Sequence, residues 1–278
     1  MRIHINHTTR YSYNESVKHS IQCLRLTPQT LAHQRVLSWR MTLPRLSSEV
    51  YDGFGNYCTI LNLAGPLQSL EIQAQGTVEI GGSAEHILDK RIHPLVFLNS
   101  TALTGCNEAM RDFAEIQTGG TPDRQGLMRL SRAVLDHMTY IPGTTHVATA
   151  AAEAFALGSG VCQDHAHVFL ACARALGVPA RYVSGYLLSD DDAHLASHAW
   201  AEAGLDGKWY VFDTTNQLFQ PSHHVQLAVG LDYNDPKWDL LLDELKLSEM
   251  HQLFNKSGWG SLAVESVGKP KTYEYDAP

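Results

Sequence analysis

A glycine-bounded turn followed by an apolar helical segment is the feature that most constrains this chain. Gly158 and Gly160 flank the turn, and Cys162 follows at the start of a segment whose apolar positions have helical spacing. The segment ends before Gly177 and Pro179, residue types that stop helices. Because most positions of the segment are apolar, we predict a buried helix with Cys162 in its first turn.

A cysteine at a helix start can become a nucleophile, because unpaired N–H groups and the helix dipole favour the thiolate there. The dipole supplies only about 0.3–1 kcal/mol, so an imidazolium partner must supply most of the remaining activation. His198 and Asp213 follow Cys162 in chain order. A hairpin turning at 204–207 would place His198 directly opposite Asp213, whose carboxylate would fix the ring tautomer. Cys162, His198 and Asp213 are therefore the candidate catalytic residues for acyl transfer through a thioester.

Four further residues are candidates for the same site. The backbone N–H groups of Cys162 and Gln163 could hold a tetrahedral oxyanion, and Gln163 and Tyr140 are the candidate side-chain donors to it. Trp200 and Tyr186 could either line an acyl-binding cleft or pack in the core. The sequence leaves both interpretations open.

Other polar residues near these motifs have ordinary structural interpretations. His165 and His167 are two apart on a helix and point to different faces, so we predict no metal site. Asp164 is expected to bind helix-start N–H groups. We expect Cys172 to be a packing residue. His223 and His224 are neighbours in the sequence, and we expect both to be solvated in a turn. The acidic run 190–192 is expected to be a solvated loop, with recognition of a basic substrate as the alternative.

Hydrophobic periodicity divides the chain into three parts. Residues 1–95 alternate apolar and polar positions in short runs separated by turns, which predicts an all-β domain, either a sandwich or a sheet. Residues 96–235 combine helical spacing, including a helix that starts at Asp123, with strands such as 180–187. The segment 236–278 is hard to assign, although 238–254 has helical spacing. The expected fold class is α+β.

Charge and cysteine usage narrow the expected partners and location. The net charge of −8 and the absence of a basic stripe argue against a nucleic-acid partner. No run approaches the roughly 18 apolar residues that span a bilayer, and the N-terminal residues lack the pattern of a signal peptide, so we expect no membrane association. Five cysteines without a CxxC pair fit a reducing compartment, which favours the cytoplasm.

Motifs in both halves of the chain resemble those of one family, the transglutaminase-like superfamily of papain-related thiol enzymes. The bacterial cysteine protease group with an N-terminal β domain is especially similar. The likeness covers roughly residues 1–235, and its motifs lie at 7–13, 24–28, 52–56, 160–167, 176–186, 197–200 and 209–216. It implies a papain-like core in which the nucleophile helix packs on an antiparallel sheet. After 229–235 the family continues to a closing β-strand, whereas this sequence continues with helical spacing.

The resemblance implies that Cys162 is the nucleophile, His198 the general acid and base, and Asp213 the residue that orients the ring. It implies no metal and no cofactor. The expected function is thiol-dependent acyl transfer on a peptide or amide substrate, ending in hydrolysis. The alternatives are protein-glutamine transamidation, acetyl transfer from a thioester donor, and a non-catalytic interaction module that keeps the fold.

Overall fold

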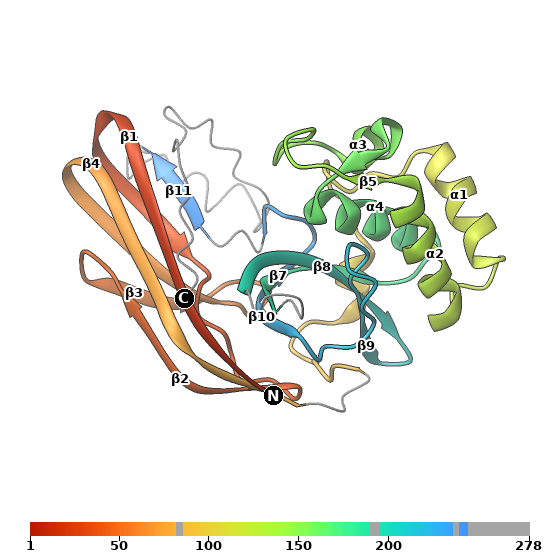
Figure 1. Ribbon diagram of the computed structural model, residues 1–278, viewed down its shortest axis with the longest axis horizontal. Helices are drawn as coiled ribbons and strands as arrows, with labels where there is room; N and C mark the ends of the chain where they lie inside the picture. The colour runs from red at the N-terminus through yellow and green to blue at the C-terminus, as the bar shows by residue number, and fades with distance from the viewer. Residues whose placement is uncertain (82–85, 189–194, 236–238, 244–278) are drawn as a thin grey trace.

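Two antiparallel sheets and a group of helices form three layers (Figure 1). This computed structural model describes residues 1–81, 86–188, 195–235 and 239–243. The N-terminal sheet lies on one side, the second sheet lies in the middle, and the helices cover the far side. The predicted α+β class is confirmed, and the helices of the second half pack on an antiparallel sheet as the resemblance implied.

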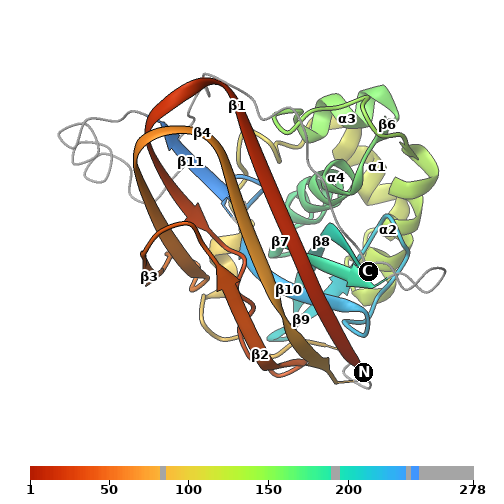
Figure 2. The same ribbon diagram turned by 60° about the vertical axis from the view of Figure 1, so that its left-hand side comes forward.

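Two long strands form the centre of the N-terminal sheet (Figure 2). Strands β1 (Arg2–Leu24) and β4 (Tyr57–Ile80) pair antiparallel, while β2 (Gln34–Thr42) and β3 (Ser47–Tyr51) both pair with β4. The sequence predicted shorter strands separated by turns. The polar stretch within β1 instead produces register shifts between Ser12 and His19, because a bulge can absorb extra residues without ending a strand. The result is a single sheet and not a sandwich.

The sheet gains its last strand from the end of the chain. Strand β11 (Asp239–Asp243) pairs antiparallel with β1, and Leu24 faces Asp239 in this register. The segment 236–278 is hard to assign from the sequence, and the helical spacing noted over 238–254 does not produce a helix at these residues, because a short apolar run such as 240–242 fits a strand as well as a helix. The rest of the segment with helical spacing, to residue 254, lies outside the described residues.

The second half of the chain supplies the helices and the middle sheet. The helices are the 3₁₀ segment η1 (Pro94–Leu98), α1 (Glu108–Thr118), α2 (Arg124–His137), α3 (Ala151–Leu157) and α4 (Cys162–Ala175). The middle sheet has the order β10-β7-β8-β9, with β7 (Ala180–Leu188), β8 (Leu195–Leu205), β9 (Lys208–Phe212) and β10 (His224–Gly230). A short parallel pair joins β5 (Thr139–Tyr140) to β6 (Ser159–Gly160). In the described part of the chain, no helix has the length and apolar character needed to cross a membrane.

The two helices predicted most clearly begin where the sequence indicates. Asp123 caps α2, since its side chain accepts a hydrogen bond from the Gly126 N–H at 2.7 Å. Helix α4 is buried on nearly all sides, and its Phe169 ring stacks on Phe212 of β9 at 4.9 Å between centroids. Cys172 is fully buried on this helix and acts as a packing residue, as predicted.

Buried contacts join the N-terminal sheet to the middle sheet. Leu227 and Tyr186 of the middle sheet share one apolar cluster with Leu26 of the N-terminal region. The Gln34 side chain accepts from the Gln226 N–H and donates to the Gln226 carbonyl, both at 2.9 Å. Both residues are buried, and a buried amide without a hydrogen-bond partner would destabilise the fold. These hydrogen bonds therefore fix the position of one sheet on the other.

Candidate active site

The turn before α4 needs glycine for reasons of space and backbone conformation. Gly158 ends α3 with a positive φ of 67°, which a glycine adopts without steric cost. A Cβ at Gly160 would lie 2.6 Å from the carboxylate of Asp164. The turn therefore delivers Cys162 as the first residue of α4, where its side chain is partly exposed.

Asp164 holds the start of the same helix. Its Oδ2 accepts hydrogen bonds from the Val161 N–H at 2.8 Å and from the Thr145 hydroxyl at 2.7 Å. The predicted role of Asp164 at the helix start is thus confirmed. A carboxylate in the first turn also interacts favourably with the positive end of the helix.

The β8–β9 hairpin positions His198, although with a register that differs from the predicted one. Asp206 and Gly207 form a two-residue turn with φ values of 51° and 74°. Leu205 therefore pairs with Lys208, and continuing the ladder would put Asp213 opposite position 200 instead of position 198. Because the difference is two residues, His198 and Asp213 still lie on the same face.

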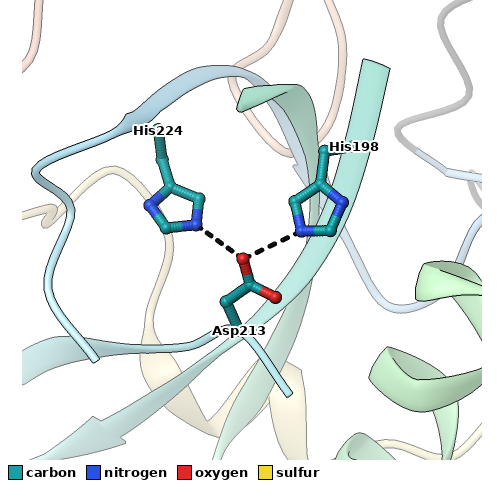
Figure 3. A group of neighbouring side chains, drawn as sticks. All are labelled: His198, Asp213 and His224. Carbon is teal, nitrogen blue, oxygen red and sulfur yellow. Dashed lines mark hydrogen bonds and ion pairs between the residues drawn. The ribbon is translucent and has the colours of Figure 1, made fainter. Parts of the chain in front are cut away.

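Asp213 accepts hydrogen bonds from two histidines through one oxygen (Figure 3). His198 Nε2 lies 2.9 Å from Asp213 Oδ2, and His224 Nε2 lies 3.0 Å from the same oxygen. The backbone N–H of Asn216 donates to Oδ1 at 3.1 Å, and its side-chain amide donates to Oδ2 at 3.0 Å. Asp213 is fully buried, so these donors replace the water that a carboxylate would otherwise bind.

The electrostatics favour a charged histidine beside a charged carboxylate. Burial raises the pKa of Asp213, but hydrogen bonds from His198 and His224 outweigh this effect and hold it well below its usual range. Burial likewise lowers the pKa of His198, but hydrogen bonds with Asp213 and Cys162, together with their charges, raise it to about 10. His198 is thus an imidazolium at neutral pH.

Cys162 and His198 line the same cavity, of about 170 Å³. Asp213 engages Nε2 of the His198 ring, so Nδ1 is the nitrogen left to exchange a proton with sulfur. The structure thus brings together all three candidate catalytic residues, from α4, β8 and the end of β9.

The four secondary candidates have different surroundings. Gln163 lines the cavity, but its amide N–H donates to the Val147 carbonyl at 3.0 Å. Tyr140 is 48% exposed and does not line the cavity. Partial burial raises its pKa, and the nearby Cys162 adds a smaller effect in the same direction. Trp200 packs in the core beneath His198 and donates to Glu202 at 3.3 Å, whereas Tyr186 forms part of the cavity wall.

The two histidines of α4 point in different directions, as predicted. The ring nitrogens of His165 lie 3.0 Å from the Thr215 hydroxyl and 3.1 Å from the Met138 carbonyl. His167 Nε2 accepts from the Tyr233 N–H at 3.1 Å. Each histidine therefore has its own structural partner.

His224 is the site residue that sequence reasoning missed. We predicted that it is solvated in a turn after Pro221, but it is the first residue of β10 and is 1% exposed. The alternation of 224–229 could have indicated a strand, but only the fold places its first residue against Asp213. Within the described residues, His198, Asp213 and His224 form the one group whose ligand atoms, all within 4.8 Å of one another, could hold a metal ion. The hydrogen bonds between them already account for this proximity.

Replacing His224 with leucine is expected to lower the free energy of unfolding by about 1.5–3 kcal/mol, because Asp213 loses one charge-assisted hydrogen bond in a buried site. His224→Gln should lose less, since its amide can still donate. Urea unfolding measures both effects, with His223→Leu as the neighbouring control. Equal losses for His223→Leu and His224→Leu would contradict this role of His224.

Comparisons with known proteins identify the family. Residues 111–214 match the family model described as the transglutaminase-like superfamily, and residues 3–79 match the bacterial transglutaminase-like N-terminal region. The uncharacterized protein ML0607 of Mycobacterium leprae is 31% identical in an alignment of 252 residues that covers 84% of this chain and 90% of that protein. The chain belongs to the transglutaminase-like superfamily. Its N-terminal region is of the bacterial type.

Two further comparisons give another relative and a shared fold. The uncharacterized protein Rv2569c of Mycobacterium tuberculosis is 27% identical over 268 residues, covering 84% of this chain and 85% of that protein. A crystal structure from Cytophaga hutchinsonii, described as a "putative cysteine protease", superposes with a TM-score of 0.70 at 20% identity. That alignment covers 88% of this chain and 89% of the other, which shows that the two share a fold.

Proposed function

We propose that this protein is a thiol hydrolase that transfers the acyl group of an amide or peptide to water through a thioester on Cys162. The single observation that carries the proposal is the position of His198. Its ring hydrogen-bonds both the buried carboxylate of Asp213 and the thiol of Cys162, and it lines the same cavity as that thiol. Membership of the superfamily supports the same class of chemistry.

In the first half of the reaction the Cys162 thiolate attacks the carbonyl carbon of the substrate and forms a C–S bond. The carbonyl oxygen becomes an oxyanion, which the N–H groups of Cys162 and Gln163 at the start of α4 can stabilise. The His198 imidazolium donates its proton to the leaving amine, the C–N bond breaks, and a thioester remains.

In the second half a water molecule replaces the amine. Neutral His198 takes a proton from water as the hydroxyl attacks the thioester carbon, and the C–S bond then breaks to release a carboxylic acid. Asp213 keeps Nε2 of His198 as the donor throughout, which leaves Nδ1 to face the reacting atoms. An amine in place of water would yield a transamidation product.

A simple activated ester tests the proposal. With p-nitrophenyl acetate we expect a burst of nitrophenol and an acetyl group on Cys162, found by mass spectrometry, which then hydrolyses. Cys162→Ala should lose the burst. Cys106→Ala removes another partly exposed thiol and should keep it. Slow acetylation spread over several cysteines would overturn the proposal and favour the non-catalytic interaction module.

A second measurement separates water from amine as the acceptor. The protein is incubated with a glutamine-bearing peptide and a labelled amine. Release of ammonia without incorporation of the label is the expected result for a hydrolase, whereas incorporation of the label would identify a transamidase.

A further inference from the structure

Part of the wall of the reaction cavity comes from the N-terminal sheet region. His7 of β1 and Leu26, just beyond the end of β1, line the cavity together with Tyr182, Tyr186 and Leu227 of the middle sheet. All five residues are at least nine-tenths buried, so they form a fixed surface. The cavity therefore lies where the two sheets meet, which is a frequent location of substrate pockets.

The wall of this cavity carries almost no charge. Of the described residues that line it, none is Asp, Glu, Lys or Arg, and His198 is the only cation. Burial lowers the pKa of His7 to about 4, so its ring is neutral at pH 7. Both of its nitrogens are held, with Nδ1 at 2.7 Å from the Tyr186 hydroxyl and Nε2 at 2.9 Å from the Thr9 hydroxyl. Burial also raises the pKa of Tyr182 well above its ordinary value, which keeps that phenol neutral.

The size of the cavity limits what can enter. Its volume of about 170 Å³ is comparable to that of an apolar cavity of about 150 Å³ that holds benzene in another protein. A leucine or phenylalanine side chain fits this size. A lysine side chain would bury its charge against Leu26 and Leu227, which is unfavourable. A glutamate side chain would meet only the cation of His198, which already pairs with Asp213.

We propose that this cavity binds an uncharged, mainly apolar side chain on the acyl part of the substrate, and that Leu26 of the N-terminal region helps to select it. The inference rests on the proposed function, since it concerns the same cavity. It assigns a substrate class to the site and gives the N-terminal region a direct role in specificity.

Affinity labels test the substrate class. Dipeptidyl chloromethyl ketones built from two leucines, two lysines or two glutamates would alkylate Cys162 at rates that depend on side-chain fit. We expect the leucine reagent to react at least about 100-fold faster than either charged reagent, because a polar or apolar mismatch in a pocket typically costs this much or more. Similar rates for the three reagents would overturn the inference.

Variants at Leu26 test the role of the N-terminal region. Leu26→Ala is expected to reduce the leucine-over-glutamate preference about tenfold or more, and Leu26→Lys should shift the preference toward the glutamate reagent. Leu61→Ala is the matched control, because Leu61 is equally buried in the same apolar cluster but does not line the cavity. The same change in preference for Leu26→Ala and Leu61→Ala would contradict selection by Leu26.

Iodoacetamide distinguishes failure of this inference from failure of the proposed function. It has no side chain to fit the cavity, so it reports only whether Cys162 is activated. If Cys162 reacts with iodoacetamide no faster in the native protein than in His198→Ala, the proposed function fails. If Cys162 reacts fast but the three chloromethyl ketones do not differ, only the inferred substrate class fails.

Discussion

Replacing His198 with alanine is expected to lower acyl transfer by about 10⁴–10⁶-fold, because the residues of such a catalytic group act as a unit. The same variant should slow alkylation of Cys162 at pH 6. In His198→Ala, Cys162 loses the positive partner that stabilises a sulfur anion, and only the helix dipole remains, worth about 0.3–1 kcal/mol. We therefore expect alkylation to slow by about tenfold or more. Iodoacetamide labelling followed by peptide mapping measures it.

Two controls make this prediction specific. His19→Ala removes a half-buried histidine of the N-terminal sheet that bonds the Asn62 side chain, and it should leave the labelling rate of Cys162 unchanged. Free imidazole should restore part of the acyl transfer of His198→Ala, since it can enter the space left by the ring. An unchanged rate at Cys162 in His198→Ala would show that the imidazole does not activate the thiol.

The local elements around the nucleophile could be predicted from the sequence because local signals fix them. Gly158, the apolar spacing after Cys162 and the stop at Gly177 define α4 without reference to the rest of the fold. The Asp206–Gly207 turn was recognisable for the same reason. Its register, however, depends on which two residues form the turn, and the predicted pairing differed by two positions.

Long-range contacts could not be predicted in the same way. Nothing near His224 in the sequence indicates a buried carboxylate partner, since Asp213 reaches it only after β10 joins the middle sheet. Similarly, Leu26 is an ordinary apolar residue until the N-terminal sheet packs on β10 and places it in the cavity. The pairing of β11 with β1 joins residues that lie far apart in the sequence, and the helical spacing in 238–254 gave no sign of it.

Replacing Asp213 with asparagine is expected to lower acyl transfer by about 10⁴-fold, because an amide can present its N–H to His198 and stabilise the wrong ring tautomer. The pH dependence should change as well. Burial lowers the pKa of His198, and in the native protein Asp213 and Cys162 overcome this to raise it to about 10. Without the carboxylate, less opposes the lowering of the His198 pKa by burial, so this pKa falls. The alkaline limb of the pH–rate profile should therefore move to lower pH, since the imidazolium that protonates the leaving amine is lost earlier.

The free energy of unfolding should depend on pH through the same two groups, His198 and Asp213. The raised pKa of His198 contributes stability that is fully present below its unfolded value of about 6.5 and is lost as pH rises through about 10. The depressed pKa of Asp213 contributes stability above the ordinary aspartate value of about 3.9, which is lost at lower pH. The difference in unfolding free energy between the native protein and Asp213→Asn should thus be largest between about pH 4 and 6.5.

Asp89→Asn is the control that separates catalysis from the general loss of a buried carboxylate. The Asp89 side chain is 5% exposed and pairs with Arg181 at 2.8 Å, but it does not line the cavity. Its loss should lower stability while the alkaline limb of the pH–rate profile stays in place. If both variants moved the limb equally, the shift would reflect a general change in the protein, and the ring of His198 would not owe its charge to Asp213. A shift confined to Asp213→Asn is the outcome that the shared oxygen of Asp213 predicts.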